Sequence, residues 1–216
     1  MNLNTDLAQR AVVHAGTLEW TPSPERGVER KMLERDGAEV ARATSLVRFA
    51  AGARFSSHRH DLGEEMLVLA GVFSDDGGDF GAGVYLRNPP GSAHAPWSEQ
   101  GCLLFVKLRQ MDPNERRRVA VDPRALRWSV LQPGVWVLEL HSGARERVEL
   151  VRLDAGGSIA LEDAGGEEAL LLDGSAQDGL GVYARYSWFR NPPGTATELG
   201  SRGGCVFYRK RGHLTR

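Results

Sequence analysis

The segment FSSHRHDLGEEMLVLAG gathers side chains that could bind a metal ion. His58 and His60 stand one residue apart, and a pair of glutamates follows just before an apolar run. Side chains alternate between the two faces of a strand, so His58, His60 and the first glutamate, Glu64, can point the same way. Glu65 then points to the opposite face, although a bulge at Gly63 would exchange the two glutamates.

A fourth metal ligand is expected from another strand. His94 follows a Pro-Pro-Gly turn in NPPGSAHAPW, and this turn would set its angle of approach. Three neutral imidazoles and one carboxylate suit a borderline divalent ion. We therefore predict one divalent transition metal per chain, zinc or iron first, with manganese, nickel or copper as alternatives. The competing interpretation is an exposed edge strand whose histidines bind nothing in particular. No catalytic acid–base pair is visible beside these residues.

An internal repeat organises the chain. GEEMLVLAG at 63–71 recurs as GEEALLLDG at 166–174, which is 103 positions later. RNPPGSA at 87–93 recurs as RNPPGTA at 190–196, at the same offset. The constant offset leaves no room for an insertion or deletion between these motifs. The protein therefore contains two copies of one unit of about a hundred residues, a plausible size for a small domain.

Short apolar segments broken by Gly, Pro and Asp make up each unit. ATSLVRFAAG, EEMLVLAGVF, GVYLRNPPG and CLLFVKLRQ each read as a strand of about five to eight residues closed by a turn signal. Strands at this regular spacing predict a sandwich or barrel, with the jelly roll as the leading candidate. We predict an all-β fold of two tandem jelly-roll barrels, the first over 1–115 and the second over 116–216.

The spacing of the motif residues resembles that of the cupin superfamily. One pattern, Gly-x5-His-x-His-x3-Glu-x6-Gly, begins at Gly52, and a second, Gly-x5-Pro-x-Gly-x2-His, begins at Gly83. The last position of the second motif, usually Asn, is Ser98 here. FSDDGGDF, YLRNPPGSAHAPW and GCLLFVKLRQ narrow the resemblance to the ChrR-like cupins. That group includes the cupin domain of ChrR-type anti-sigma factors and small cupins described as acetylacetone or dihydroxyacetophenone dioxygenases.

This resemblance implies a bicupin of two double-stranded β-helix barrels. It also implies a metal site in the first barrel, held by residues that match His58, His60, Glu64 and His94. The 103-residue offset fills the same four positions of the second copy with Leu161, Asp163, Glu167 and Thr197. A lone carboxylate beside leucine and threonine is a poor transition-metal site. We therefore predict that the second barrel is metal-free.

Composition and charge exclude several classes of function. The chain has 27 basic and 28 acidic residues, so no global field favours nucleic acid or an anionic membrane. No apolar run approaches the roughly 20 residues of a membrane-spanning helix, and the N-terminus lacks a signal-peptide pattern. The cytoplasm is the expected location. The arginines of ERRRVAVDPRALR at 115–127 are interpreted as a solvated linker, and the acidic SDDGGDFGAG at 74–83 as a tight turn.

Cys102 and Cys205 recur at the repeat offset and are interpreted as small buried hydrophobes. Residues kept in both copies cannot be present for the metal alone, so they are assigned to the scaffold. The three histidines occur only in the first copy and are assigned to function. The expected partner is a small-molecule ligand or substrate. A homodimer is a further hypothesis, because barrels with exposed edge strands often pair.

Three functional hypotheses remain. The first is a mononuclear dioxygenase that cleaves a carbon–carbon bond of a small diketone or hydroxyketone, with the metal carrying most of the chemistry. The second is an anti-sigma-factor-like sensory or regulatory cupin with a structural zinc. In the anti-sigma factors that this chain resembles, sigma binding belongs to a helical segment with zinc-binding His and Cys. The first 40 residues here contain no cysteine, so direct sigma-factor binding is not expected. The third is a metal that only stabilises a barrel used to bind a partner.

Overall fold

A computed structural model describes residues 2–38 and 40–215. The fold is all-β, as the sequence predicts, with strands joined by turns and two short 3-10 segments, η1 (Ala15–Thr17) and η2 (Pro123–Ala125). Among the described residues no helix is long and apolar enough to cross a membrane.

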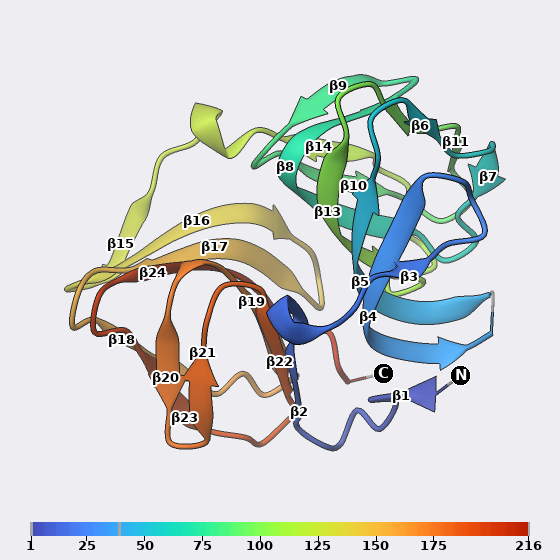
Figure 1. The fold of residues 1–216 in the computed structure, drawn as a ribbon. Coiled ribbons are helices and arrows are strands. Elements are labelled where there is room, and N and C mark those ends of the chain that lie inside the picture. The colour runs from blue at the N-terminus through green and yellow to red at the C-terminus, as the bar shows by residue number, and fades with distance from the viewer. Residues whose placement is uncertain (1, 39, 216) are drawn as a thin grey trace. The chain divides into compact units, whose positions relative to one another are not determined.

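The chain forms two compact units (Figure 1). The first contains Leu18–Ala125 together with the residues up to Thr5, and the second contains Asp6–Thr17 together with the chain from Leu126 onward. The predicted boundary at residue 115 therefore differs from the structure in two short segments. The physical reason is strand pairing, because each of these segments supplies an edge strand to the unit in which it is placed.

The first unit is a jelly-roll barrel. Its largest sheet has the strand order β1-β4-β5-β13-β8-β10-β14. The far half of the long strand β8 turns into the second layer, where it pairs with β9 and β12, while β6 pairs with β12, and β7 with β11. The strands of this unit are β1 (Asn2–Leu3), β3 (Thr21–Pro22), β4 (Val28–Gly37), β5 (Ala41–Phe49), β6 (Ala53–Arg54), β7 (His58–Arg59), β8 (Glu64–Asp75), β9 (Gly78–Gly81), β10 (Tyr85–Asn88), β11 (Ala93–His94), β12 (Trp97–Ser98), β13 (Cys102–Leu108) and β14 (Val119–Val121).

The second unit repeats this design. It contains two sheets. The larger has the strand order β15-β16-β17-β24-β19-β22-β2, and the smaller has the order β18-β23-β20-β21. Its strands are β2 (Ala11–His14), β15 (Ser129–Gln132), β16 (Val135–Ser142), β17 (Arg147–Leu153), β18 (Ser158–Leu161), β19 (Glu167–Gly174), β20 (Ala176–Asp178), β21 (Gly181–Tyr183), β22 (Ser187–Asn191), β23 (Thr197–Gly200) and β24 (Cys205–Arg211).

Alternate residues of the central strands fill each barrel, as the period of a strand requires. On β13 the side chains of Cys102, Leu104 and Val106 enter the apolar cluster of the first unit. On β24 Cys205 and Phe207 do the same in the second. Both cysteines are free and buried, which confirms their interpretation as small core residues.

One sheet edge is closed in the same way in both units. Strand β14 pairs with β10 and places Ala120 opposite Leu86. Strand β2 pairs with β22 and places Val12 opposite Phe189, the residue 103 positions after Leu86. These short strands satisfy backbone groups that a sheet edge would otherwise leave unpaired. They explain why residues 6–17 belong to the second unit and residues 116–125 to the first, although a single cut of the sequence would place them the other way round.

Candidate metal centre

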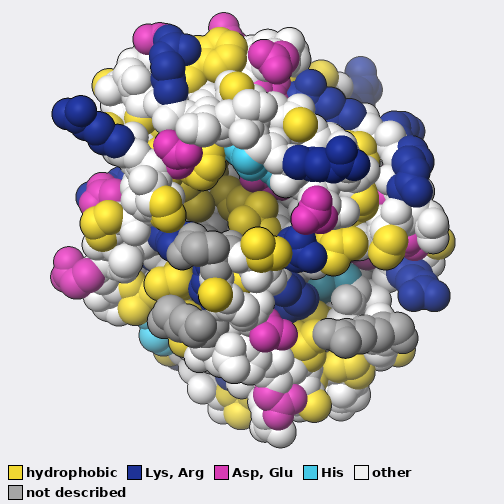
Figure 2. Space-filling model, turned by 90° about the vertical axis from the view of Figure 1, so that its right-hand side faces the viewer, with side chains coloured by type: hydrophobic (Ala, Val, Ile, Leu, Met, Phe, Trp, Pro, Cys, Tyr) yellow, Lys and Arg dark blue, Asp and Glu magenta, His cyan; other side chains and the backbone are white. Residues whose placement is uncertain are grey.

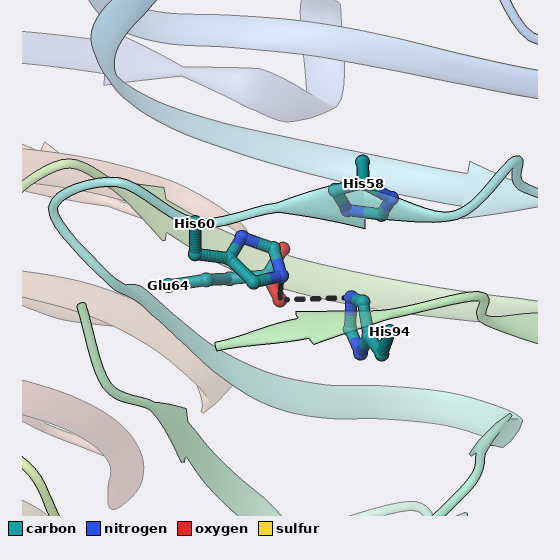
Figure 3. A group of neighbouring side chains, drawn as sticks. All are labelled: His58, His60, Glu64 and His94. Carbon is teal, nitrogen blue, oxygen red and sulfur yellow. Dashed lines mark ion pairs between the residues drawn. The ribbon is translucent and has the colours of Figure 1, made fainter. Parts of the chain in front are cut away.

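The four predicted ligand residues converge in the first unit (Figure 3). The centroids of the three imidazole rings lie 4.7, 4.8 and 4.9 Å apart. One ligand atom from each of His58, His60, Glu64 and His94 lies within 4.8 Å of all the others. The Oε2 atom of Glu64 lies 3.4 Å from Nε2 of His60 and 3.5 Å from Nε2 of His94. The fold thus brings together side chains from residues 36 positions apart.

Three strands, together with the turn between two of them, supply these side chains. His58 on β7 lies directly opposite His94 on β11. Strand β7 ends one residue later, His60 lies beyond it, and β8 begins only at Glu64. The alternation along one continuous strand, on which the prediction rested, is therefore not what aligns the three groups. Gly63 makes the turn with a φ of 79°, and a Cβ there would meet the Met111 sulfur at 2.4 Å.

Glu64 is the glutamate that joins the histidines, as expected, and Glu65 belongs to a different contact. The Oε2 atom of Glu65 accepts a hydrogen bond of 3.0 Å from Nη1 of Arg87, and both side chains are buried. The equivalent buried residues of the second unit are Glu168 and Arg190. This recurrence supports the assignment of Arg87 to the scaffold.

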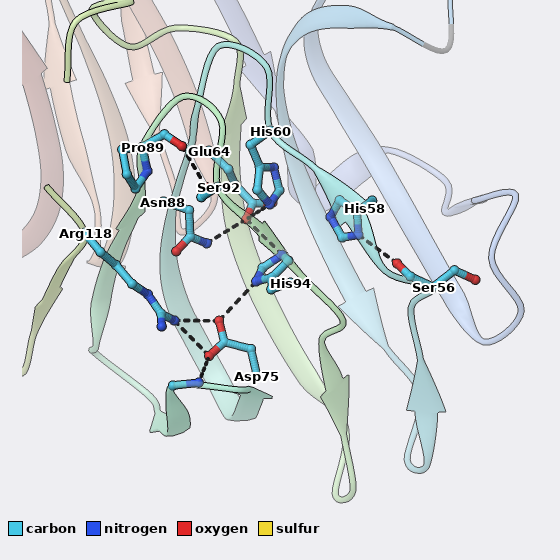
Figure 4. Close-up of polar contacts among 11 residues, drawn as sticks. Ser56, His58, His60, Glu64, Asp75, Asn88, Pro89, Ser92, His94 and Arg118 are labelled. Atoms are coloured by element: carbon cyan, nitrogen blue, oxygen red, sulfur yellow. Dashed lines mark hydrogen bonds and ion pairs between the residues drawn. The ribbon is translucent and has the colours of Figure 1, made fainter. Parts of the chain in front are cut away.

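A second layer of polar groups orients the candidate ligands (Figure 4). Nδ1 of His58 lies 2.9 Å from the carbonyl oxygen of Ser56, and Nδ1 of His94 lies 3.0 Å from Oδ2 of Asp75. When Nδ1 donates in these contacts, the Nε2 atom of each ring keeps its lone pair for a metal. Asn88 donates a hydrogen bond of 3.1 Å to Oε2 of Glu64.

Unpartnered nitrogen atoms provide the test of whether a metal fits. The Nε2 atoms of His60 and His94 are buried and have no hydrogen-bond partner among the described residues. Burial lowers the pKa of His60, and the neighbouring Glu64 carboxylate only partly opposes this effect. The neutral form that a metal ligand needs is therefore favoured. Buried lone pairs aimed at a carboxylate are costly without a bound cation, so the donor set fits a divalent metal ion.

Asp75 and Arg118 belong to the site although the sequence interpretation assigned them elsewhere. Arg118 donates hydrogen bonds of 2.8 and 2.7 Å to the two oxygens of Asp75. Burial alone would raise the pKa of Asp75, but hydrogen bonds from His94 and Arg118 outweigh it and lower the pKa to about 2. The segment interpreted as a solvated linker thus supplies an arginine that holds the orienting carboxylate of His94, and the acidic turn supplies that carboxylate.

The candidate ligands lie in the wall of a cavity of about 280 Å³. Much of the remaining wall is apolar and comes from alternate residues of neighbouring strands, including Val47 on β5 and Leu104 and Val106 on β13. Figure 2 shows a hollow with apolar side chains in its depth and charged side chains of both signs around it. A ligand of modest size could therefore reach the histidines.

The model of the ChrR Cupin-like domain family matches this sequence twice, over residues 8–112 and 116–215. The chain belongs to this family. Because the two matches follow the two repeats, the protein is a bicupin, as the internal repeat and the resemblance to cupins implied. Comparison of the sequence with curated proteins finds no match.

Solved structures share the fold of this bicupin. A candidate dioxygenase from Nostoc punctiforme superposes with a TM-score of 0.79 at 15% identity, covering 97% of this chain and 85% of that one. The protein YlbA of Escherichia coli superposes with a TM-score of 0.74 at 14% identity, covering 98% and 94%. The bacterial pirin YhhW of Escherichia coli, in complex with nickel(II), gives 0.71 at 12% identity, covering 96% and 100%. At these identities the likeness establishes the fold alone.

The second cupin keeps the carboxylate but surrounds it differently. Leu161 lies opposite Thr197 in the β18–β23 pair, the register that His58 and His94 occupy in the first cupin. Glu167 accepts a hydrogen bond of 2.6 Å from Nε of Arg209. Arg209 stands 103 positions after Val106, so an arginine has replaced an apolar wall residue. A guanidinium neutralises the carboxylate there, which supports the prediction of a metal-free second barrel.

Proposed function

We propose that the first cupin is a mononuclear metal dioxygenase that cleaves a carbon–carbon bond of a small diketone or hydroxyketone. The observation that carries this proposal is the position of the candidate ligands in the wall of a cavity. A catalytic metal site keeps a position open for substrate, whereas a metal that only stabilises the fold suits a closed site. Iron is the ion we assign to this activity.

The chain's own residues hold the ligands and limit access of water. His58 and His94 are each oriented through Nδ1, which leaves Nε2 directed toward the cavity. Phe55 and Phe73 pack beside these rings, with centroid distances of 4.7 Å to His58 and 6.0 Å to His94. A bound iron ion would supply the reaction with dioxygen and the Lewis acidity that a chelating substrate needs.

The proposed reaction balances without an added reductant. A diketone R–CO–CH2–CO–R′ and one O2 give the acid R–COOH and the 2-oxoaldehyde R′–CO–CHO. The bond between the CH2 carbon and one carbonyl carbon breaks, and one oxygen atom enters each product. One hydrogen of the CH2 group remains on the aldehyde, and the other leaves as the proton of the acid.

The regulatory hypothesis with a structural zinc ranks second. A metal site without access from a cavity would favour it, and the wall position of the candidate ligands argues for the enzyme instead. The two free cysteines suit a reducing compartment, which supports the expected cytoplasmic location.

The test combines metal analysis with oxygen uptake. Protein purified anaerobically without chelators or an affinity tag is analysed by elemental mass spectrometry, loaded with Fe(II), and supplied with diketones and hydroxyketones in an oxygen-electrode cell. We expect about one metal ion per chain, and oxygen uptake above that of Fe(II) alone. His94→Ala should abolish the uptake. Absence of uptake by the iron-loaded protein with every substrate of either class would rule out the proposed activity.

A further inference from the structure

Among the described residues, four arginines line the cavity that holds the candidate metal ligands. They are Arg30, Arg35, Arg59 and Arg109. Asp61 and Glu64 are the only acidic residues among the described residues of the wall. Positive charge is therefore in excess there even before the charge of a divalent ion is added. A cavity of this kind attracts an anionic ligand more strongly than a neutral one.

Arg30 is the arginine whose surroundings are most informative. It lies on β4 opposite Val47 of β5, and both residues line the cavity. Its Nε atom is buried and has no hydrogen-bond partner among the described residues. A buried guanidinium nitrogen without an acceptor costs stability, and Arg30 alone among the four arginines of the described cavity wall has one, so a ligand in the cavity could supply the missing acceptor. A carboxylate is the acceptor that the guanidinium fork matches best.

The second cupin provides an internal control for this position. Val28 and Arg30 occupy the same register on β4 as Val135 and Val137 on β16. Val137 packs against the apolar core of the second cupin. The repeat thus accepts valine at this position, and an arginine is not required to build the barrel.

The other three arginines follow the same rule. Strand register and the repeat offset place Ser142, Glu162 and Gly212 at the positions of Arg35, Arg59 and Arg109. All four arginines of the cavity are therefore confined to the cupin that has the three histidines. Because basic residues and candidate metal ligands occur together, both belong to the same function.

The sheet order sets the spacing that a ligand must span. Glu64 lies on β8 and Arg30 lies on β4, and the strands β5 and β13 stand between them. Val47, Leu104 and Val106 line the cavity on these two intervening strands. A ligand that reaches from the metal to Arg30 therefore crosses an apolar wall.

We propose that the substrate of the first cupin carries a carboxylate, joined through a short apolar spacer to the two oxygens that chelate the metal. Arg30 binds this carboxylate. The inference rests on the proposed function, because it adds a third group to the diketone or hydroxyketone already assigned to the site. The substrate class is then an oxo-carboxylic acid with its chelating oxygens at one end and its acid group at the other.

The test compares two probes of the same carbon chain. 4,6-Dioxoheptanoate and heptane-2,4-dione share a chelating diketone, and they differ in a carboxylate against a methyl group. Binding of each to the Zn(II)-loaded protein is measured by titration calorimetry. We expect the carboxylate probe to bind about tenfold more tightly, the effect of one charge-assisted contact.

Substitution of Arg30 tests whether this residue causes the difference in affinity between the two probes. In Arg30→Val, the residue that the second cupin carries, the ratio of the two affinities should fall to about one. Arg30→Gln should give the same result, because it removes the charge while keeping a polar side chain. Arg48→Gln is the matched control, since Arg48 lies on β5, pairs with Glu29 and is exposed. Its ratio should equal that of the wild type.

Equal affinities in the wild type, a ratio that survives loss of Arg30, or binding of neither probe would each overturn the inference. Failure of the proposed function gives a different result. If the protein binds the carboxylate probe through Arg30 but its iron-loaded form consumes no oxygen, the inferred ligand class stands and the proposed dioxygenase activity is refuted.

Discussion

The Nδ1 atom of His94 lies 3.0 Å from the Asp75 carboxylate, and both side chains are buried. Arg118 holds the same carboxylate from its other side with two hydrogen bonds. A candidate metal ligand is thus fixed through an aspartate by an arginine from the segment that ends in the edge strand β14. This chain of contacts connects closure of the sheet edge to the orientation of an imidazole.

The second cupin contains the same pair without the histidine. Nη2 of Arg10 lies 2.9 Å from Oδ2 of Asp178, the residue 103 positions after Asp75. Arg10 directly precedes β2, as Arg118 precedes β14. Tyr183 donates a hydrogen bond of 2.7 Å to Asp178. The arginine–aspartate pair therefore belongs to the scaffold of both barrels, and the first cupin also uses it to orient a ligand.

Asp75→Asn should weaken metal binding about 10- to 100-fold, because the imidazole of His94 loses its charged acceptor. The affinity is measured by competition with a chromophoric chelator. Asp178→Asn is the matched control, since it removes the equivalent carboxylate from the cupin without histidines, and it should leave metal affinity unchanged. Equal affinities in wild type and Asp75→Asn would show that the contact does not support the site.

His58→Ala and His94→Ala should each lose bound metal and the thermal stabilisation that added metal gives to the wild type. A ligand that binds only the folded state raises stability by mass action, so loss of the site removes the rise in Tm. Metal content is measured by elemental mass spectrometry and Tm by calorimetry. Thr197→Ala, at the position equivalent to His94, should alter neither quantity. Full metal occupancy in either histidine variant would contradict the four-ligand assignment.

Much of the fold could be predicted because the repeat and the strand periods are local features of the sequence. The edge strands could not, since Val12 pairs with Phe189 and no local signal marks so distant a partner. The four candidate ligands were found from their spacing, but the reason given was incomplete. The turn at Gly63 interrupts the strand, so His58 and Glu64 come from two separate strands, β7 and β8, and His60 lies between them.

The outer contacts of the site were missed because charge runs and Asp-Gly turns usually lie in solvent. Asp75 and Arg118 were assigned to such segments. One signal could have identified them. Asp75 recurs as Asp178 in the second repeat, and Arg10 and Arg118 begin the similar segments RAVV and RVAV. The arginines of the cavity gave no such signal. Their common feature is absence from the second repeat, and only strand register shows which residues to compare.

Arg209→Met should lower the free energy of unfolding by about 3 kcal/mol, the cost of leaving a buried carboxylate without its partner. Arg209 lies 2.6 Å from Glu167 and 3.3 Å from Glu149, and all three side chains are largely buried. Urea denaturation measures the loss. Adding Glu167→Gln to this variant should recover part of the stability, because the amide removes the unpaired charge at position 167, while Glu149 keeps Arg211 at 3.5 Å. A loss that is the same in the single and double variants would argue against an electrostatic cause.

Both thiols should resist modification in the folded protein. Burial raises the pKa of Cys102 to about 11 and also raises that of Cys205. At pH 8 about one Cys102 thiol in a thousand is then ionised, and the thiolate is the reactive form. We expect a chromogenic disulfide reagent to modify neither cysteine within minutes under native conditions and both in urea, with a native rate that rises with pH. Rapid reaction at pH 8 would contradict this burial argument. It would also support cysteine-based sensing and so favour the regulatory hypothesis over the enzyme.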